Sequence, residues 1–175
     1  MDQVFSFWFG VAVISVIGTI AHFLYDWSNH NKIVGLFAAV NESTWEHIKI
    51  ALTPTLLYSL YDGYIYGTYK SYFFAKLISL LLVIILIPLI YYLYNLILKK
   101  DLFFINILIF YFTIFISQLV FYNLLKINNI SFLTQYISCI LLFILFGCYL
   151  LLTLLPLEIE LFKDPITNKY GFKGH

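Results

Sequence analysis

Apolar residues run in long stretches along this chain, and short polar connections separate them. Four stretches, at about 5–25, 73–98, 102–125 and 131–155, are almost continuously apolar. A bilayer core of about 30 Å takes roughly 20 helical residues to cross, so each stretch is long enough to span it. With the more polar stretch described next, the pattern predicts an all-α fold, a polytopic membrane bundle of about five transmembrane helices.

The second stretch, at about 44–66, differs from the others because polar side chains occur throughout it. It carries Glu46, Lys49 and Asp62, together with several hydroxyl groups. Ionised groups at membrane depth must face other helices or a wet cavity, since lipid offers them no partners. His47, residues 51 and 55, Tyr58 and Asp62 recur at helical spacing, which predicts one polar stripe on this helix.

Pro54 lies in the middle of the same stretch. Proline has no N–H, so it should kink the helix and free the carbonyl of Ile50. We expect the hydroxyl group of Thr53 or Thr55 to compensate.

One connection, at 26–41, is long for so compact a chain. Its apolar run at 32–40 is too short to span and predicts a small interfacial or re-entrant helix. We expect residues 1–157 to form a single transmembrane domain and residues 158–175 to form a polar C-terminal tail.

Composition agrees with a protein of the lipid bilayer. The 175 residues are 62% hydrophobic and 11% charged, whereas soluble domains are nearer half apolar and a quarter charged. This excludes a soluble enzyme, and the absence of a basic stretch argues against nucleic acid as a partner.

Lysine placement predicts the orientation in the cell membrane. With five crossings, seven lysines fall on the side of the first connection and three on the other. Positive charge is retained inside. The N-terminus is therefore expected outside and the C-terminus in the cytoplasm.

Polar residues that could carry chemistry gather between positions 22 and 47. His22 and Asp26 are four apart, so both project from one helix face, and Glu42, Glu46 and His47 follow near the start of the next long helix. If the two helices are antiparallel neighbours, these ends meet at one surface. The candidate binding residues are His22, Asp26, Asn31, Asn41, Glu42, Glu46, His47, Tyr58 and Asp62.

Three interpretations of this cluster compete. In the structural one, Ser43 and Glu46 form a capping box that begins the second long helix. In the second, a Zn²⁺, Mn²⁺ or Fe²⁺ ion is bound. Its ligands would be His22, Asp26, Glu46 and His47. In the third, the cluster binds a small solute or a lipid headgroup, and Glu46→Gln should abolish binding while the protein folds nearly normally.

Nothing in the chain identifies a catalytic mechanism. No nucleophile elbow, His-Glu-x-x-His or phosphate-binding loop is present. Cys139 and Cys148 lie in apolar surroundings and on roughly opposite helix faces, so neither resembles a nucleophile and they should not pair. Whether the protein is an enzyme stays open.

The block Asn41-Glu-Ser-Thr-Trp-Glu-His47-Ile-Lys49 and the tail around 162–171 resemble an uncharacterised family of small bacterial multi-pass membrane proteins. That resemblance brings no assigned activity.

The run Asp26-Trp-Ser-Asn-His-Asn31 is similar to the calcium-binding loop of alkaline ceramidases. The similarity implies Ca²⁺ on Asp26, Asn31 and Glu42 through oxygen ligands. The chain departs from those enzymes because no histidine occurs between His47 and His175 to supply their catalytic zinc site.

Taken together, these patterns favour a binding or transport-related membrane protein that uses the cluster at the cytoplasmic ends of the first two long helices. A metal-dependent membrane enzyme acting on a lipid or headgroup is the first alternative. A structural or accessory subunit that docks onto a larger membrane complex is the second.

Overall fold

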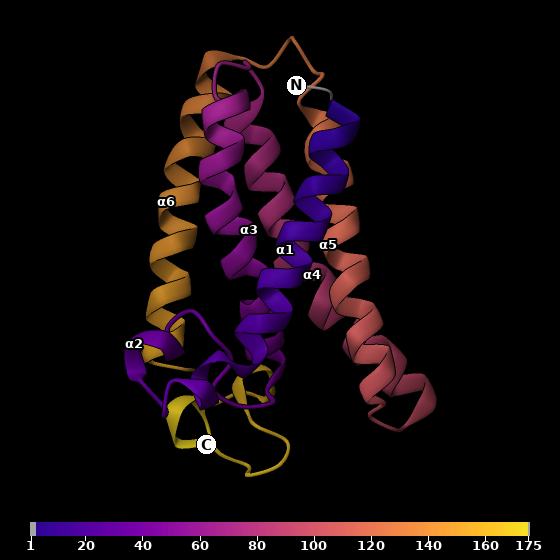
Figure 1. Ribbon diagram of the computed structural model, residues 1–175, viewed down its shortest axis with the longest axis vertical. Coiled ribbons are helices and arrows are strands. Elements are labelled where there is room, and N and C mark those ends of the chain that lie inside the picture. Colours follow the sequence, from indigo (N-terminus) through magenta and orange to yellow (C-terminus); the bar gives the residue numbers. More distant parts are fainter. Residues whose placement is uncertain (1–2, 175) are drawn as a thin grey trace.

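The computed structural model describes residues 3–174, which form a bundle of long helices (Figure 1). The helices are α1 (Gln3–Trp27), α2 (Lys32–Gly35), α3 (Thr44–Tyr66), α4 (Tyr72–Leu98), α5 (Phe103–Leu124) and α6 (Phe132–Leu154), followed by the 3-10 turns η1 (Glu160–Phe162) and η2 (Gly171–Gly174). The two chain termini lie at opposite ends of the long axis. We call the end that carries the C-terminus the base.

Four helices, α1, α4, α5 and α6, are long and apolar enough to cross a membrane. The all-α architecture with long apolar helices expected from the sequence is therefore present and is consistent with a membrane protein, but the expected count of five spanning helices is only partly met. The helix α3 is long enough, yet three ionised side chains and a lower hydropathy separate it from the other four. The short helix expected within 26–41 is α2.

The polar helix α3 is the most enclosed of the long helices. Fourteen of its 23 residues are buried, and it packs against both α1 and α4. In contrast, only 17% to 39% of the most apolar window of each of the other four is buried. This arrangement follows from chemistry, because α3 carries the groups that lipid cannot solvate and the apolar helices can face lipid.

Close packing of α1 on α3 depends on Gly18 and Pro54. Pro54 offers no N–H to the carbonyl of Ile50. A Cβ on Gly18 would lie 2.5 Å from that carbonyl oxygen, so only glycine permits this approach. The hydroxyl groups do not compensate as expected: Thr55 donates to the carbonyl of Ala51, and Thr53 bonds Tyr149. The helix α3 is continuous through Pro54, and its kink stays a prediction.

An ion pair in the core joins α3 to α4. The Nζ of Lys76 donates to Oδ2 of Asp62 at 2.6 Å, and both side chains are buried. The hydroxyl of Tyr122 on α5 donates to the other carboxylate oxygen at 3.1 Å. Burial of these charges is tolerated because each has a partner, which ties three helices together far from the base.

The C-terminal tail folds back onto the base of the bundle. The ring of Phe162 lies 4.9 Å from that of Trp45, measured between centroids, and buries it. The side-chain amide of Asn41 donates to the carbonyl of Gly171 at 2.9 Å. The backbone N–H of Glu42 donates to Asp164 at 3.2 Å. The segment expected to be a polar tail therefore covers the start of α3.

Candidate functional site

Two histidines flank one carboxylate at the base of the bundle. His22, near the end of α1, places its Nε2 3.7 Å from Oε1 of Glu42. His47, in the first turn of α3, places its Nε2 3.8 Å from Oε2 of the same residue. The imidazole rings are 6.2 Å apart between centroids. We call His22, Glu42 and His47 the histidine–glutamate cluster.

Backbone contacts fix the orientation of this cluster. The Nδ1 of His47 lies 3.0 Å from the carbonyl oxygen of Ser43. Because a carbonyl only accepts, Nδ1 must carry the hydrogen there, and Nε2 is the nitrogen that faces Glu42. Glu42 is itself positioned by Asp164 of the tail, which accepts its backbone N–H.

A polar cavity of about 240 Å³ opens beside the cluster. The carboxylate-bearing residues in its wall come from three parts of the chain: the end of α1, the segment before α3, and the tail. The lining residues are His22, Asp26, Ala39, Val40, Asn41, Glu42, Asp164, Ile166, Thr167 and Gly174. Asp164 is buried and holds Thr167 through both its N–H and its hydroxyl, so the tail wall is ordered.

An apolar cavity of about 120 Å³ lies on the other side of the cluster, between α1, α3 and α5. Its wall is mostly aromatic and aliphatic. The lining residues are Thr19, His22, Phe23, His47, Ile50, Phe103, Asn106, Ile107, Phe110 and Tyr111. The α4–α5 hairpin turns away from α1 at the base (Figure 1). His22 lines both cavities and therefore stands at their boundary.

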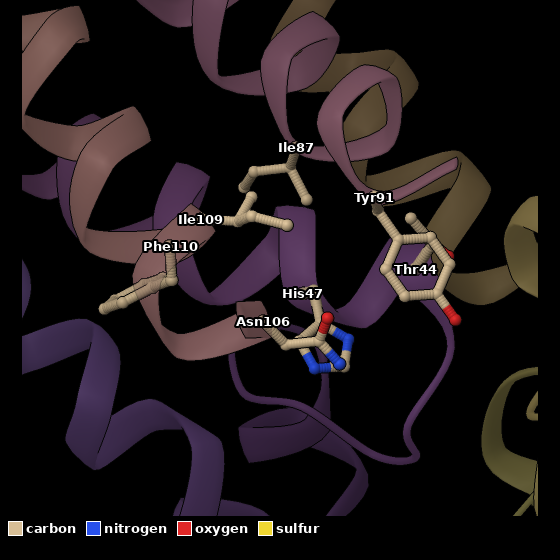
Figure 2. A pocket seen from close by; sticks show the side chains of 7 residues that line it. All are labelled: Thr44, His47, Ile87, Tyr91, Asn106, Ile109 and Phe110. Atoms are coloured by element: carbon tan, nitrogen blue, oxygen red, sulfur yellow. The ribbon is translucent and has the colours of Figure 1, made fainter. Parts of the chain in front are cut away.

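Figure 2 shows a smaller cavity of about 20 Å³ on the α4 side of His47. His47 and Asn106 lie at one side of it, and Ile87, Ile109 and Phe110 lie at the other. Asn106 was not anticipated from the sequence. Its amide donates to Asp101, and its carbonyl oxygen accepts from Tyr94. A lone Asn in an apolar helix carries no signal that would place it beside His47.

Glu46 and Asp26 do not join the cluster as expected. Glu46 is buried and accepts from the Nζ of Lys49 at 2.6 Å and from the N–H of Val40 at 3.0 Å. Asp26 lines the polar cavity, but its carboxylate is exposed and lies 3.5 Å from His30. The expected meeting of helix ends is confirmed for His22 and His47, with Glu42 as the carboxylate between them.

Other expected site residues have structural roles. Asn31 is the N-cap of α2 and accepts the N–H of Ile33. Ser43 is the N-cap of α3, as predicted, and accepts the N–H of Glu46 at 3.4 Å. The second hydrogen bond expected of the capping box, from the N–H of Ser43 to the side chain of Glu46, is replaced by others. Glu46 accepts from the N–H of Val40, and the N–H of Ser43 donates to Asn41. This difference arises because residues 36–40 fold so that their backbone lies next to the first turn of α3.

Tyr58 and Asp62 lie deeper in the bundle and line neither cavity of the cluster. Asp62 belongs to the core ion pair with Lys76 described above. Tyr58 is buried with its ring 5.2 Å from that of Tyr61. The polar stripe predicted on α3 is thus present, but its upper part is packed as core.

No group of three or more His, Cys, Asp or Glu within residues 3–174 is arranged to hold a metal ion. Two of the expected metal ligands, Asp26 and Glu46, have other partners, as above. Of the three residues in the calcium hypothesis, Asp26 and Glu42 line one cavity, whereas Asn31 caps α2.

Comparisons with known proteins locate the chain in a family but give it no activity. No curated protein and no solved structure matches it. One family model matches residues 3–172, which is nearly the whole chain, and the expectation of an uncharacterised family is confirmed. The chain belongs to DUF6512, a family of unknown function.

Proposed function

We propose that this protein binds an amphipathic molecule at the base of its helix bundle. The polar group of the ligand occupies the polar cavity at the histidine–glutamate cluster. The first few methylene groups of its hydrocarbon chain occupy the apolar cavity between α1, α3 and α5, and the rest of the chain extends out of this cavity into the lipid. Such a site serves a membrane protein that binds or transports its ligand.

One observation carries this proposal: His22 lines both cavities. The two spaces therefore meet at one side chain, with carboxylates on one side and aromatic rings on the other. Small-molecule sites are typically apolar pockets with a few placed polar groups, often between the helices of a bundle. A ligand with a polar end and an apolar end matches this division.

The charges around the polar cavity favour an amine or ammonium head. Asp26, Glu42 and Asp164 line it, and no lysine does. Asp164 is buried and accepts three hydrogen bonds, whereas the side chains of Asp26 and Glu42 are 61% and 44% exposed, so these two are the carboxylates that a ligand can reach. A phosphate head would be repelled by these charges, whereas an ammonium group would pair with them.

The site would lie on the cytoplasmic side of the cell membrane. We propose that α3 crosses together with the four apolar helices, since the termini lie at opposite ends of the bundle. Lys49 and Lys76 do not count as loop charges, because both are buried in ion pairs. The remaining lysines still favour the base, six against two, which supports a cytoplasmic position for it.

Thermal unfolding in nanodiscs with three soluble probes tests this proposal. Dodecylamine has the chain and the amine, butylamine has the amine alone, and dodecyl phosphate has the chain with the wrong charge. A ligand at 100 times its Kd stabilises a protein by about 2.7 kcal/mol. We expect stabilisation by dodecylamine, and by neither of the others at the same concentration.

Glu42→Gln is the matching variant, because it removes the charge between His22 and His47 and keeps the size of the side chain. Glu158→Gln is its control, since Glu158 is exposed on the tail and lies outside both cavities. Loss of the dodecylamine effect in Glu42→Gln alone supports the proposal. Equal stabilisation of both variants, or by dodecyl phosphate, contradicts it.

A metal-dependent enzyme acting on a lipid is the second candidate. It is favoured by the two Nε2 atoms that face the two oxygens of Glu42. The ligands would be His22, Glu42 and His47, which would have to close to about 2.0–2.2 Å around a Zn²⁺ ion. Elemental analysis of the purified protein tests it: a stoichiometric metal that is lost in Glu42→Gln would favour the enzyme.

A further inference from the structure

A large groove lies on the opposite flank of the bundle from the histidine–glutamate cluster, between α3, α4 and α6. Its volume is about 690 Å³, within the range of small-molecule sites. Its walls include Leu57 and Leu60 of α3 and Phe143 and Phe146 of α6. These four side chains are 41% to 75% exposed, so the groove is open at its sides.

The polar groups in the groove are already bonded within the protein. The hydroxyl of Tyr149 donates to the carbonyl of Leu36 at 2.7 Å, and accepts from Thr53 at 2.7 Å. The hydroxyl of Tyr72 donates to the carbonyl of Ser59 at 2.7 Å. Ser59 in turn donates to a backbone carbonyl of its own helix.

The amino group of Lys76, which also lines the groove, is paired with Asp62. It further lies 3.7 Å from the centroid of the Phe121 ring, which offers a second favourable contact for the charge. The hydroxyl groups are bonded, and the Lys76 side chain is only 2% exposed, so the surface that the groove offers a ligand is almost entirely apolar. A polar solute would lose its hydration there and gain nothing in return.

We propose that this groove holds the hydrocarbon chain of a bilayer phospholipid. The groove is continuous with the lipid-facing surface formed by the exposed apolar side chains of α3 and α6, so chains reach it laterally from the membrane. Recognition is by the chain alone, because the hydroxyl groups are bonded and the Lys76 ammonium is too buried to select a headgroup.

The size of the groove argues against a protein helix as occupant. A helix with side chains is 10–12 Å wide and rises 5.4 Å per turn, which corresponds to roughly 400–600 Å³ per turn. A volume of 690 Å³ therefore holds less than two turns. A crossing helix needs about 30 Å of length. A helix could therefore insert only some of its side chains, whereas a thin flexible chain fits inside the groove.

The test uses phosphatidylcholine that carries a nitroxide on its acyl chain, added in trace amounts to phosphatidylcholine vesicles containing the protein. Electron paramagnetic resonance separates chains held by the protein from mobile ones. Cys139→Trp fills the groove from its α6 wall. Gly147→Trp is the matched control on the same helix, because a side chain at Gly147 meets nothing within 4 Å.

We expect the wild type and Gly147→Trp to show a held component that exchanges slowly with unlabelled lipid, and Cys139→Trp to lose it. Labelled phosphatidylglycerol should give the same held fraction as phosphatidylcholine. If Cys139→Trp fails to fold, Leu142→Trp, which also lines the groove, replaces it. An unchanged held component in a folded groove variant overturns the proposal. A held component that is restricted to one headgroup also overturns it. A change from dimer to monomer in Cys139→Trp overturns it as well, because it would assign the groove to a second copy of the protein.

Discussion

At the scale of single residues, the ion pair Glu46–Lys49 is the contact near the site whose loss should lower the free energy of unfolding most. Both side chains are almost fully buried, and their charged atoms are 2.6 Å apart. Lys49 also donates to the carbonyl of Gly35 at 2.8 Å, which anchors α2. Removal of one member of a buried pair leaves an uncompensated charge, which costs roughly 3–5 kcal/mol.

Glu46→Gln should therefore unfold easily, contrary to the near-normal folding that the sequence alone suggested. We expect a loss of roughly 3–5 kcal/mol in the free energy of unfolding, measured by denaturant titration in detergent. The double variant Glu46→Leu/Lys49→Met should recover only part of it, because neither charge then remains buried but the Val40 N–H and the Gly35 carbonyl lose their partners. A stable Glu46→Gln protein would show that Lys49 is neutral or that water reaches it.

Gly18 sets the distance between α1 and α3. In Gly18→Ala the new methyl group would meet the Ile50 carbonyl at 2.5 Å and the Phe110 ring at 2.6 Å. We expect a destabilisation of about 1–3 kcal/mol by overpacking. Gly147→Ala has open space and should instead gain up to about 1 kcal/mol from helix propensity. Equal effects of the two substitutions on the unfolding midpoint would contradict the close packing described here.

At the scale of elements, the tail and the start of α3 form one unit through Asp164. This carboxylate accepts from the backbone N–H of Glu42 and from the N–H and hydroxyl of Thr167. Asp164→Ala should cost roughly 1–3 kcal/mol locally, because buried donors lose their acceptor. Hydrogen exchange at the Glu42 and Thr167 amides should speed up, and trypsin should cleave the tail faster.

Glu158→Ala is the control for this substitution, since Glu158 is an exposed carboxylate of the same tail. Its exchange and cleavage rates should match those of the wild type. Fast exchange in both variants would mean that the tail is not held at Asp164.

The positions of the long helices could be predicted from hydrophobic runs, because chain length and bilayer thickness constrain them. The N-cap Ser43 and the enclosure of α3 could also be predicted, since both follow from local chemistry and the cost of charges in lipid. The pairing of Lys49 with Glu46 was accessible in principle, because residues three apart on a helix are neighbours.

The contacts of the candidate site depend on tertiary structure and could not be predicted. Asp164 is 122 residues from Glu42, and Asn106 lines a cavity with His47 only because α4 returns the chain to the base, where α5 begins. Burial of Trp45 under Phe162 has the same origin. A sequence pattern shows which face of a helix is apolar, but it does not show which distant segment of the chain packs on that face.

At the scale of the whole molecule, the orientation in the membrane stays a prediction. Lys70 lies between α3 and α4, at the end opposite the base, and Lys173 lies in the tail; both are exposed. In a background with both native cysteines changed to serine, Lys70→Cys should react with a membrane-impermeant maleimide on intact cells. Lys173→Cys should react only after permeabilisation, and labelling of Lys173→Cys from outside would reverse the orientation.

The central claim is that an amphiphile binds across the boundary at His22. The most direct measurement is photo-crosslinking with a dodecylamine that carries a diazirine on its chain a few carbons from the amine, followed by peptide mass spectrometry. We predict labelling within 103–111 of α5 and 19–23 of α1, where the apolar cavity lies. This labelling should be competed by unlabelled dodecylamine and absent in Glu42→Gln. Labelling spread evenly over the lipid-facing helices, without competition and unchanged in Glu42→Gln, would contradict the account.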